Sequence, residues 1–317
     1  MSDVTLRFSS SLPVPALIAQ SDENTARRFV EFFTAQIRNK NTRQAYGRAV
    51  GQFLSWCGGR GLTLRAIEPV HVAAYIEQHP ASTATVKQHL AAIRSLFDYL
   101  VTGQALPANP AHAVRGPKLS RDVGVTPVLS PDQARRLLAH PDPDRLVGVR
   151  DRAVIALMLY SFARVSAVCG LLVRDYFPQG KRWQVRLTEK GGKVRVLPVH
   201  HAAEAALDAW LAAAGIQREK KTPLFRKVDR QGRLTDEALT RRAVYKLIRT
   251  HAEAVGIDSV PIGAHSMRGT GITTYLENGG SLETAQRIAG HASIKTTRLY
   301  DRRDQRVQLS EIERVQF

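Results

Sequence analysis

The chain has 317 residues, enough for two domains of ordinary size, and 44% of them are hydrophobic, enough to form packed cores. Its 46 lysines and arginines outnumber 28 aspartates and glutamates, which gives a formal net charge of +18 spread over both halves. Nucleic acid is the commonest partner of so basic a chain. A high isoelectric point without such a partner, or an association with ribosomes, is the competing explanation.

The cysteines and the apolar segments exclude several classes of protein. Cys57 and Cys169 lie far apart and have no CxxC spacing, so we expect neither a disulfide framework nor a zinc site. The N-terminus lacks the charged region and apolar core of a secretory signal, and no apolar run approaches the length of a membrane span. The sequence therefore predicts a soluble, cytoplasmic protein with no membrane partner.

The first predicted unit is a bundle of helices. Residues 1–21 have no clear period and are expected to be irregular, whereas 22–106 carry apolar residues at helical spacing. Asn41-Thr42 is typical of a helix start, and Gly58-Gly59 is typical of a helix end. We expect a compact bundle of four or five helices over 22–106.

A basic linker is predicted to follow this bundle over residues 107–128. The linker contains four prolines and little periodicity, so it is expected to be extended. Ser130 then offers a helix cap, and Pro131 occupies the first helical position. A second domain is therefore predicted over 129–300.

The second domain is predicted to be mostly helical with one small sheet. Residues 182–198 alternate apolar and polar side chains around Lys190-Gly191-Gly192-Lys193, which predicts a β-hairpin with a glycine turn. A tail over 301–317 has apolar residues at near-helical spacing. Helices are expected near 201–214, 236–255, 266–277, 282–289 and 293–300. The predicted fold class is mainly α with a small β-sheet.

Tyr300 is the first candidate for chemistry. A phenol has a pKa near 10, so it attacks efficiently only when a base or a positive field assists its deprotonation. His265 and Arg268 are three residues apart at a predicted helix start, which places both on one face of the first turn. A guanidinium and an imidazole there suit a phosphate oxygen. Taken alone, each of these residues is more often an ordinary surface side chain.

Three further positions extend this set. His291 follows Gly290, which resembles the glycine that ends a helix. Arg164 lies among apolar neighbours, where a guanidinium is costly to bury unless an anion meets it. Lys190 and Lys193 lie at the predicted hairpin turn, from which a lysine can reach a DNA groove and protonate a leaving oxygen. Each residue has a structural explanation too, as a turn residue, a snorkelling side chain or a solvated lysine.

The motifs occur in the order Arg, Lys, HxxR, GH, Tyr within one domain. This ordered series arises by chance much less often than any one of its motifs. Arginines, histidines and a lysine around a tyrosine provide what a pentavalent phosphate requires, and no carboxylate cluster predicts a metal or other cofactor. From about residue 22 to the end, the chain closely resembles the tyrosine site-specific recombinase (phage integrase) family. The resemblance implies an N-terminal helical core-binding (SAM-like) domain and an α+β catalytic domain.

The resemblance also implies roles for these residues. Arg164 and Arg268 match the two phosphate-clamping arginines, and Lys190 matches the hairpin lysine proposed as general acid to the 5′ oxygen. The two imidazole positions of the family fall on His265 and His291. Tyr300 matches the nucleophile, which forms a 3′-phosphotyrosyl bond and frees a 5′-hydroxyl without ATP.

The partner implied is double-stranded DNA at a specific recombination site. The protein would bind a site as a dimer and form a tetramer in the synapse, with the 301–317 tail docking on a neighbouring subunit. Side chains of the bundle, the linker and the hairpin are the candidates for DNA contact. These candidates are Asn41, Thr42, Arg43, Lys87, Arg94, Arg115, Lys118 and Lys193.

One position departs from the family pattern. An acidic residue often lies three positions after the first arginine, and here that position is Ala167. We interpret the chain as a recombinase of a mobile element, phage or plasmid. A type IB topoisomerase or resolvase using the same chemistry is one alternative. A DNA-binding accessory protein with a weak site is the other, which Ala167 favours slightly and the complete set of six residues opposes.

Overall fold

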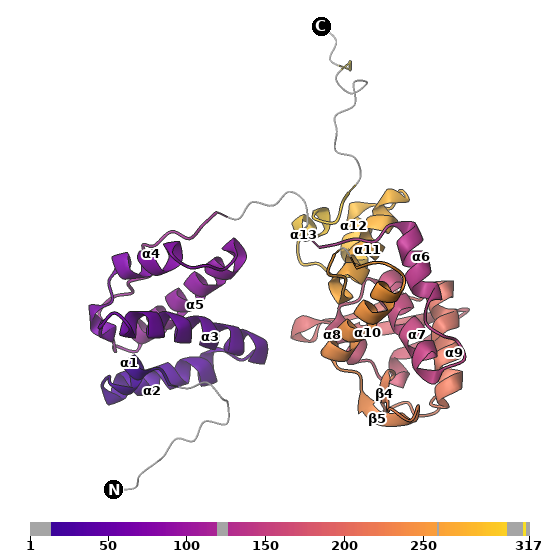
Figure 1. Cartoon of the computed structure of the whole chain (residues 1–317), viewed down its shortest axis with the longest axis horizontal. Coiled ribbons are helices and arrows are strands. Elements are labelled where there is room, and N and C mark those ends of the chain that lie inside the picture. The colour runs from indigo at the N-terminus through magenta and orange to yellow at the C-terminus, as the bar shows by residue number, and fades with distance from the viewer. Residues whose placement is uncertain (1–13, 119–125, 259, 303–312, 315–317) are drawn as a thin grey trace. The chain divides into compact units, whose positions relative to one another are not determined.

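The computed structural model describes residues 14–118, 126–258, 260–302 and 313–314, except for the side chain of Lys190. The chain divides into two compact units, Met1–Ser120 and Arg121–Phe317, which Figure 1 colours from indigo to purple and from magenta to yellow. Nearly all of the predicted tail lies outside the described residues.

The described part of the first unit is helical. Asn39 begins the long helix α3 by accepting hydrogen bonds from the backbone N–H groups of Asn41 and Thr42. Aromatic side chains, among them the fully buried Phe53 and Phe97, fill the space between the helices. The elements are α1 (Ala16–Ala19), α2 (Glu23–Glu31), a π-helical turn (Phe32–Gln36), α3 (Lys40–Gly58), a 3₁₀ turn (Leu64–Ala66), α4 (Pro69–Glu77) and α5 (Thr83–Thr102).

The segment that follows α5 folds back onto this helix. The guanidinium of Arg94, on α5, donates to the backbone carbonyls of Ala111 and Val114. Both of those residues are buried in the core of the first unit. The first part of the segment predicted as an extended linker, as far as residue 114, is therefore packed against the bundle.

The second unit combines helices with two small antiparallel sheets. One sheet has the strand order β1-β2-β3, and the other pairs β4 with β5. Among the described helices of both units, none combines the length and the apolar character that crossing a bilayer requires. The helices are α6 (Pro131–Ala139), α7 (Leu146–Ser161), α8 (Val165–Cys169), α9 (His201–Ala214), α10 (Arg241–Ala254), α11 (Ala264–Glu277), α12 (Leu282–Ala289) and α13 (Ile294–Arg298). The strands are β1 (Tyr176–Gln179), β2 (Arg182–Thr188), β3 (Val194–Pro198), β4 (Arg226–Val228) and β5 (Leu234–Ala238).

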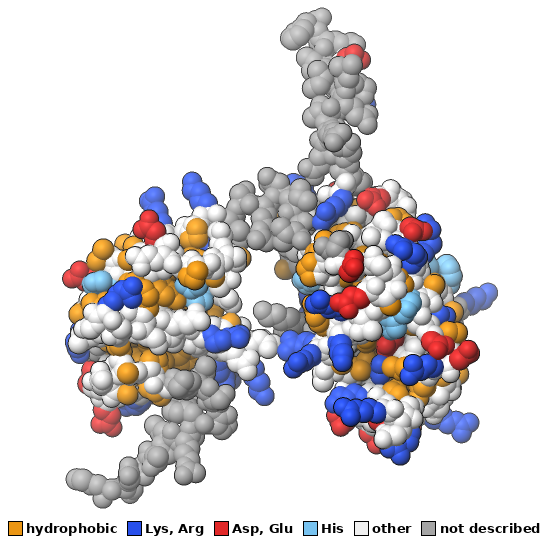
Figure 2. Space-filling view, viewed as in Figure 1, with side chains coloured by type: hydrophobic (Ala, Val, Ile, Leu, Met, Phe, Trp, Pro, Cys, Tyr) orange, Lys and Arg blue, Asp and Glu red, His pale blue; other side chains and the backbone are white. Residues whose placement is uncertain are grey.

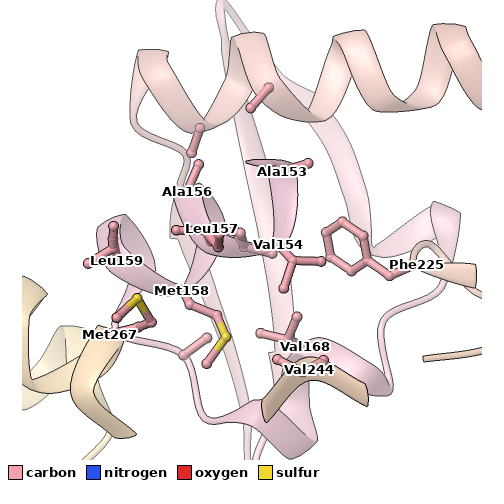
Figure 3. Close-up of a cluster of buried hydrophobic side chains, with 14 of the residues drawn as sticks. Ala153, Val154, Ala156, Leu157, Met158, Leu159, Val168, Phe225, Val244 and Met267 are labelled. Atoms are coloured by element: carbon pink, nitrogen blue, oxygen red, sulfur yellow. The ribbon is translucent and has the colours of Figure 1, made fainter. Parts of the chain in front are cut away.

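Helix α7 is the centre of the second unit. It packs against α6, α9, α10 and α11, and its residues 153–159 are almost completely buried. Figure 3 shows side chains of α7 meeting Val168, Phe225, Val244 and Met267 from four other segments. This core fixes the C-terminal end of α7 and the start of α11, where the candidate residues lie.

The prediction of a helix over 236–255 is wrong at the start of that range. Residues Leu234–Ala238 form β5, which pairs with β4, and α10 begins at Arg241. Thr240 caps α10, because its hydroxyl accepts a hydrogen bond from the N–H of Ala243. Pairing with the preceding strand β4, rather than helical periodicity, decides the conformation of these residues.

Candidate active site

Arg268 is held at the centre of the candidate site by the backbone. It lies on α11 and is 1% exposed. Its two terminal nitrogens donate to the carbonyls of Phe162 and Ala289, the second at 2.6 Å. Burial, and then the nearby Arg164, lower the pKa of Arg268 to about 10, so the side chain stays cationic at neutral pH. The two carbonyls fix the plane of the guanidinium and leave its remaining N–H groups for an anion.

Phe162 connects this arginine to the next one. It ends α7 with φ of 53°, in the left-handed region that bulky residues rarely adopt. This turn brings the carbonyl of Phe162 to Arg268 and makes Arg164 the N-cap residue of α8. Strained backbone of this kind is concentrated at functional sites.

Arg164 is partly exposed and is paired with a buried carboxylate. Its Nη1 lies 2.5 Å from Oε2 of Glu189, and the other carboxylate oxygen lies 2.5 Å from Nη2 of Arg195. Burial raises the pKa of Glu189, but the hydrogen bonds and charges of the two arginines outweigh burial and hold this pKa below its usual value. Glu189 is therefore ionised at neutral pH.

His291 lies in the turn after α12. Gly290 ends that helix with φ of 61°, as the GH pair predicts. His291 is 7% exposed, and its Nδ1 is 2.9 Å from the hydroxyl oxygen of Thr297. Burial first, and then the charges of Arg268, Arg164 and Arg195, lower the pKa of His291 to about 3, against the opposing effect of Glu189. Its imidazole is neutral at neutral pH.

His265 lies in the first turn of α11, three residues before Arg268, as predicted. Its side chain is exposed, although the surrounding protein removes enough water to lower its pKa. The charges of Arg268 and Arg164 act in the same direction. A neutral imidazole that is open to solvent can accept a proton.

Tyr300 follows α13 and is 8% exposed. Its ring is stacked on His291, with the ring centroids 5.9 Å apart and the planes at 10°. Its backbone carbonyl accepts a hydrogen bond of 2.7 Å from the hydroxyl of Thr273. A Cβ built on Gly269 would come within 3.3 Å of the Tyr300 ring, so the ring lies directly against the α11 backbone.

The structure thus gathers five of the six predicted catalytic residues. Tyr300 stacks on His291, and the charges of Arg164 and Arg268 act on each other and on the two imidazoles. Lys190 begins the hairpin turn, where Gly191 has φ of 81°, and the lysine side chain lies outside the described residues. No group of three or more His, Cys, Asp or Glu side chains in the described parts of the chain is arranged to hold a metal ion.

The predicted DNA contacts fall into three groups. Arg43 and Arg94 already donate to backbone carbonyls of their own unit. Thr42 is half-buried, beside the cap of α3. The other five candidates have exposed side chains. These are Asn41, Lys87, Arg115, Lys118 and Lys193.

Two buried members of the site were missed by sequence reasoning. Glu189 precedes the glycine turn, where an exposed carboxylate is the usual expectation. Arg195 points inward from β3, although it lies between Val194 and Val196, which are 53% and 45% exposed. Alternation along a strand predicts the opposite, with the valines inside. The sequence of this strand therefore carries no signal that locates Arg195 inside.

Two family models match the chain. The model described as "Phage integrase family" matches residues 127–306, and "Phage integrase, N-terminal SAM-like domain" matches 27–104. Tyrosine recombinase XerC of Thermodesulfovibrio yellowstonii is 30% identical over 271 residues, which are 83% of this chain and 85% of that protein. Tyrosine recombinase XerC of Myxococcus xanthus is 33% identical over 229 residues, 70% of this chain and 71% of that protein.

Solved structures with the same fold include two protein–DNA complexes. XerH site-specific recombinase bound to palindromic difH has a TM-score of 0.68 at 18% identity, and the match covers 89% of this chain and 93% of XerH. A lambda integrase dimer bound to a COC′ core site has a TM-score of 0.66 at 18% identity, covering 90% and 80%. The predicted fold class is confirmed. The chain belongs to the phage integrase family and is a tyrosine recombinase.

Proposed function

We propose that this recombinase cuts and rejoins double-stranded DNA at a specific site through a 3′-phosphotyrosyl intermediate on Tyr300. The observation that carries the proposal is the convergence of Tyr300 with His291, Arg268 and Arg164, which come from four separate segments. XerH site-specific recombinase was solved bound to its difH substrate and lambda integrase bound to a COC′ core site, which supports a DNA site as the substrate here.

In the proposed cleavage step, a bond forms between the phenolic oxygen of Tyr300 and phosphorus as the bond from phosphorus to the 5′ oxygen breaks. The phenolic proton passes to a base, for which the neutral, exposed imidazole of His265 is suited. Lys190 is proposed to give a proton to the 5′ oxygen. A 5′-hydroxyl of the partner strand then reverses the step, so the energy of the phosphodiester is retained and no ATP is consumed. The step is proposed to need no metal, because the arginines supply positive charge to the non-bridging oxygens.

The two arginines would hold the non-bridging oxygens. Arg268 is oriented by two carbonyls and Arg164 by Glu189, so their free N–H groups are positioned before the phosphate arrives. The neutral imidazole of His291 can donate a further hydrogen bond through Nε2 when Thr297 donates to Nδ1.

A plasmid assay separates the proposed function from its alternatives. A supercoiled plasmid that carries two copies of the recombination site should yield recombinant circles. Relaxation of the plasmid without exchange would instead identify a topoisomerase-like enzyme. Site binding with neither product would identify an accessory protein, and the sequences flanking the gene provide the first candidate sites.

For the biological role, we propose integration, excision or resolution for a mobile element, phage or plasmid, in the cytoplasm. The protein would bind each site as a dimer and join two sites as a tetramer, with the 301–317 tail on a neighbouring subunit. Lysine and arginine side chains lie on the surfaces of both units (Figure 2), which supports DNA contact by each of them.

The affinity for DNA is expected to depend steeply on salt. A protein that contacts about 6–10 phosphates loses roughly 10³–10⁵ in affinity when salt rises from about 50 to about 200 mM. Lys87→Ala should weaken binding and reduce the slope of log Kd against log salt by about one, because Lys87 is exposed on α5. Fluorescence anisotropy over a salt series measures both quantities.

Arg94→Ala is the matched comparison on the same helix. Arg94 donates to two carbonyls of the 111–114 segment, so its removal should lower the thermal midpoint of the first unit and leave the salt slope near that of the wild type. A nearly flat salt response of the wild-type protein would contradict binding through phosphates. An equal loss of slope in both variants would contradict the assignment of a phosphate contact to Lys87 and a purely structural role to Arg94.

Gly269→Ala is expected to separate stability from activity. The new methyl group would press on the Tyr300 ring, whose nearest atoms would lie at 3.3 and 3.4 Å. A displacement of a few tenths of an ångström should slow covalent trapping of DNA by roughly 10-fold. Alanine in place of glycine in a helix stabilises it by up to about 1 kcal/mol, so the thermal midpoint should not fall.

Gly51→Ala provides the control for this substitution. Gly51 lies inside α3, and a Cβ there would meet no atom within 4 Å. This variant should gain the same helix stability and trap DNA at the wild-type rate. If Gly269→Ala also traps DNA at that rate, the position of Tyr300 does not depend on its contact with α11.

A further inference from the structure

We propose that Glu189 is a positioning residue of the phosphate site, which orients Arg164 and connects the β2–β3 hairpin to the turn that carries His291. This inference rests on the proposed function and adds a residue to it. Ala167 lies where the family pattern led us to expect an acidic residue, and this alanine is buried, at 2% exposed. Glu189 brings a carboxylate to Arg164 from the hairpin instead.

The environment of Glu189 is unusual for a carboxylate. Its side chain is 4% exposed, and a buried carboxylate is costly unless both oxygens are paired. Each oxygen accepts a charge-assisted hydrogen bond of 2.5 Å, one from Arg164 and the other from Arg195. Among the described residues, no other acidic side chain forms an ion pair with either arginine. Loss of this carboxylate would leave two guanidinium groups unbridged.

Arg195 extends the connection to the His291 turn. Its other terminal nitrogen donates to the carbonyl of Ile288, near the end of α12. A Cβ on Gly290 would come within 2.6 Å of the Arg195 side chain, so this arginine lies directly against the turn before His291. The chain of contacts therefore runs from the start of α8, through Glu189, to the backbone beside His291.

Glu189 also holds the base of the hairpin turn. Its N–H donates to the carbonyl of Lys193 at 2.7 Å, and its own carbonyl accepts from Gly192 at 3.1 Å. Lys190, the proposed general acid, is the next residue along the chain. The same residue thus fixes the backbone from which Lys190 extends and the guanidinium that meets the phosphate.

The charges around Glu189 distinguish a residue that positions Arg164 from one that attracts the DNA phosphate. Arg164, Arg195 and Arg268 lie around a single buried carboxylate, so the cluster is cationic before DNA binds. Removing the negative charge makes the cluster more attractive to a phosphodiester while leaving Arg164 without its partner. Loss of Glu189 should therefore slow cleavage without weakening DNA binding, whereas a lost phosphate contact would weaken binding.

Glu189→Gln tests this inference, because it preserves the shape of the side chain and removes its charge. Single-turnover trapping on a nicked suicide substrate should slow roughly 10- to 100-fold. Losses of this size are typical when a hydrogen-bond partner that orients a metal ligand is removed, and Glu189 orients Arg164 in the same way. The Kd for the same DNA should be unchanged or lower. Glu237→Gln is the control, because Glu237 forms an exposed ion pair with Lys227 and should have no effect on either quantity.

A relocated carboxylate provides the second test. Position 167 is three residues after Arg164, in the first turn of α8, so Ala167→Glu can return a carboxylate to that arginine. The double variant with Ala167→Glu and Glu189→Gln should regain at least about 10-fold of the lost trapping rate if Arg164 is the group that Glu189 orients. Glu189→Asp, which keeps the charge, should trap DNA faster than Glu189→Gln.

Two results would overturn the inference. One is wild-type trapping by Glu189→Gln. The other is a slow Glu189→Gln protein whose rate neither the relocated carboxylate nor aspartate improves, at a thermal midpoint equal to that of the wild type. If Glu189→Gln does not fold, the trapping rates of Glu189→Asp and of the double variant test the inference instead. Failure of the wild-type protein itself to trap DNA would count against the proposed function and not against the role of Glu189.

Discussion

Tyr300→Phe should abolish covalent trapping of DNA while leaving site binding intact. The phenylalanine ring retains the stacking on His291 and the contact with Gly269, so the fold around position 300 should be preserved. The phenolic oxygen, which is the proposed nucleophile, is lost. Removal of a nucleophile costs more than about 10³-fold in rate, so no covalent complex should be visible on a denaturing gel.

Tyr275→Phe is the matched control for this substitution. Tyr275 packs against the same small cluster as Tyr300, and its ring contacts Phe162 at a centroid distance of 6.0 Å. It should trap DNA at close to the wild-type rate. A covalent complex that persists in Tyr300→Phe and disappears in Tyr275→Phe would reassign the nucleophile.

Local signals in the sequence predicted most of the elements that carry the site. Ser130 and Pro131 begin α6 with a reciprocal cap between Ser130 and Gln133, as the serine–proline pair indicated. Gly290 ends α12 in the left-handed conformation. The hairpin over 182–198 was found because alternation and a glycine turn are both short-range features. Such signals depend on hydrogen bonds within a few residues, which a sequence displays directly.

Two short-range strand pairings, of β5 with β4 and of β1 with β2, were not predicted. Features that depend on distant partners were not predicted either. Glu189 is buried because arginines at positions 164 and 195 meet it, and neither its burial nor its charge partners follow from local pattern. The six candidate residues were found by their order and spacing, yet the groups that hold them in place required the tertiary structure.

Arg268 bonds backbone carbonyls from distant parts of the chain, and its substitution is expected to cause the second large loss of trapping rate. Arg268→Lys keeps one positive charge but replaces a planar fork by a single ammonium group. Lysine cannot donate to both Phe162 and Ala289 and still offer two N–H groups to a phosphate. Trapping on the nicked substrate should fall by roughly 10²–10³-fold, as it does when one preorganised donor to a developing anion is removed.

The same substitution should also weaken the fold. A buried carbonyl left without a donor costs about 1–3 kcal/mol, so the free energy of unfolding measured by denaturant should fall by about that amount. Arg287→Lys on the exposed face of α12 is the control and should change neither quantity, because Arg287 bonds only a threonine hydroxyl of its own helix among the described residues. Wild-type trapping by Arg268→Lys would show that charge alone, without the fork, suffices for the phosphate. Slow trapping with unchanged stability would show instead that the two carbonyls orient the guanidinium for catalysis without contributing to the fold.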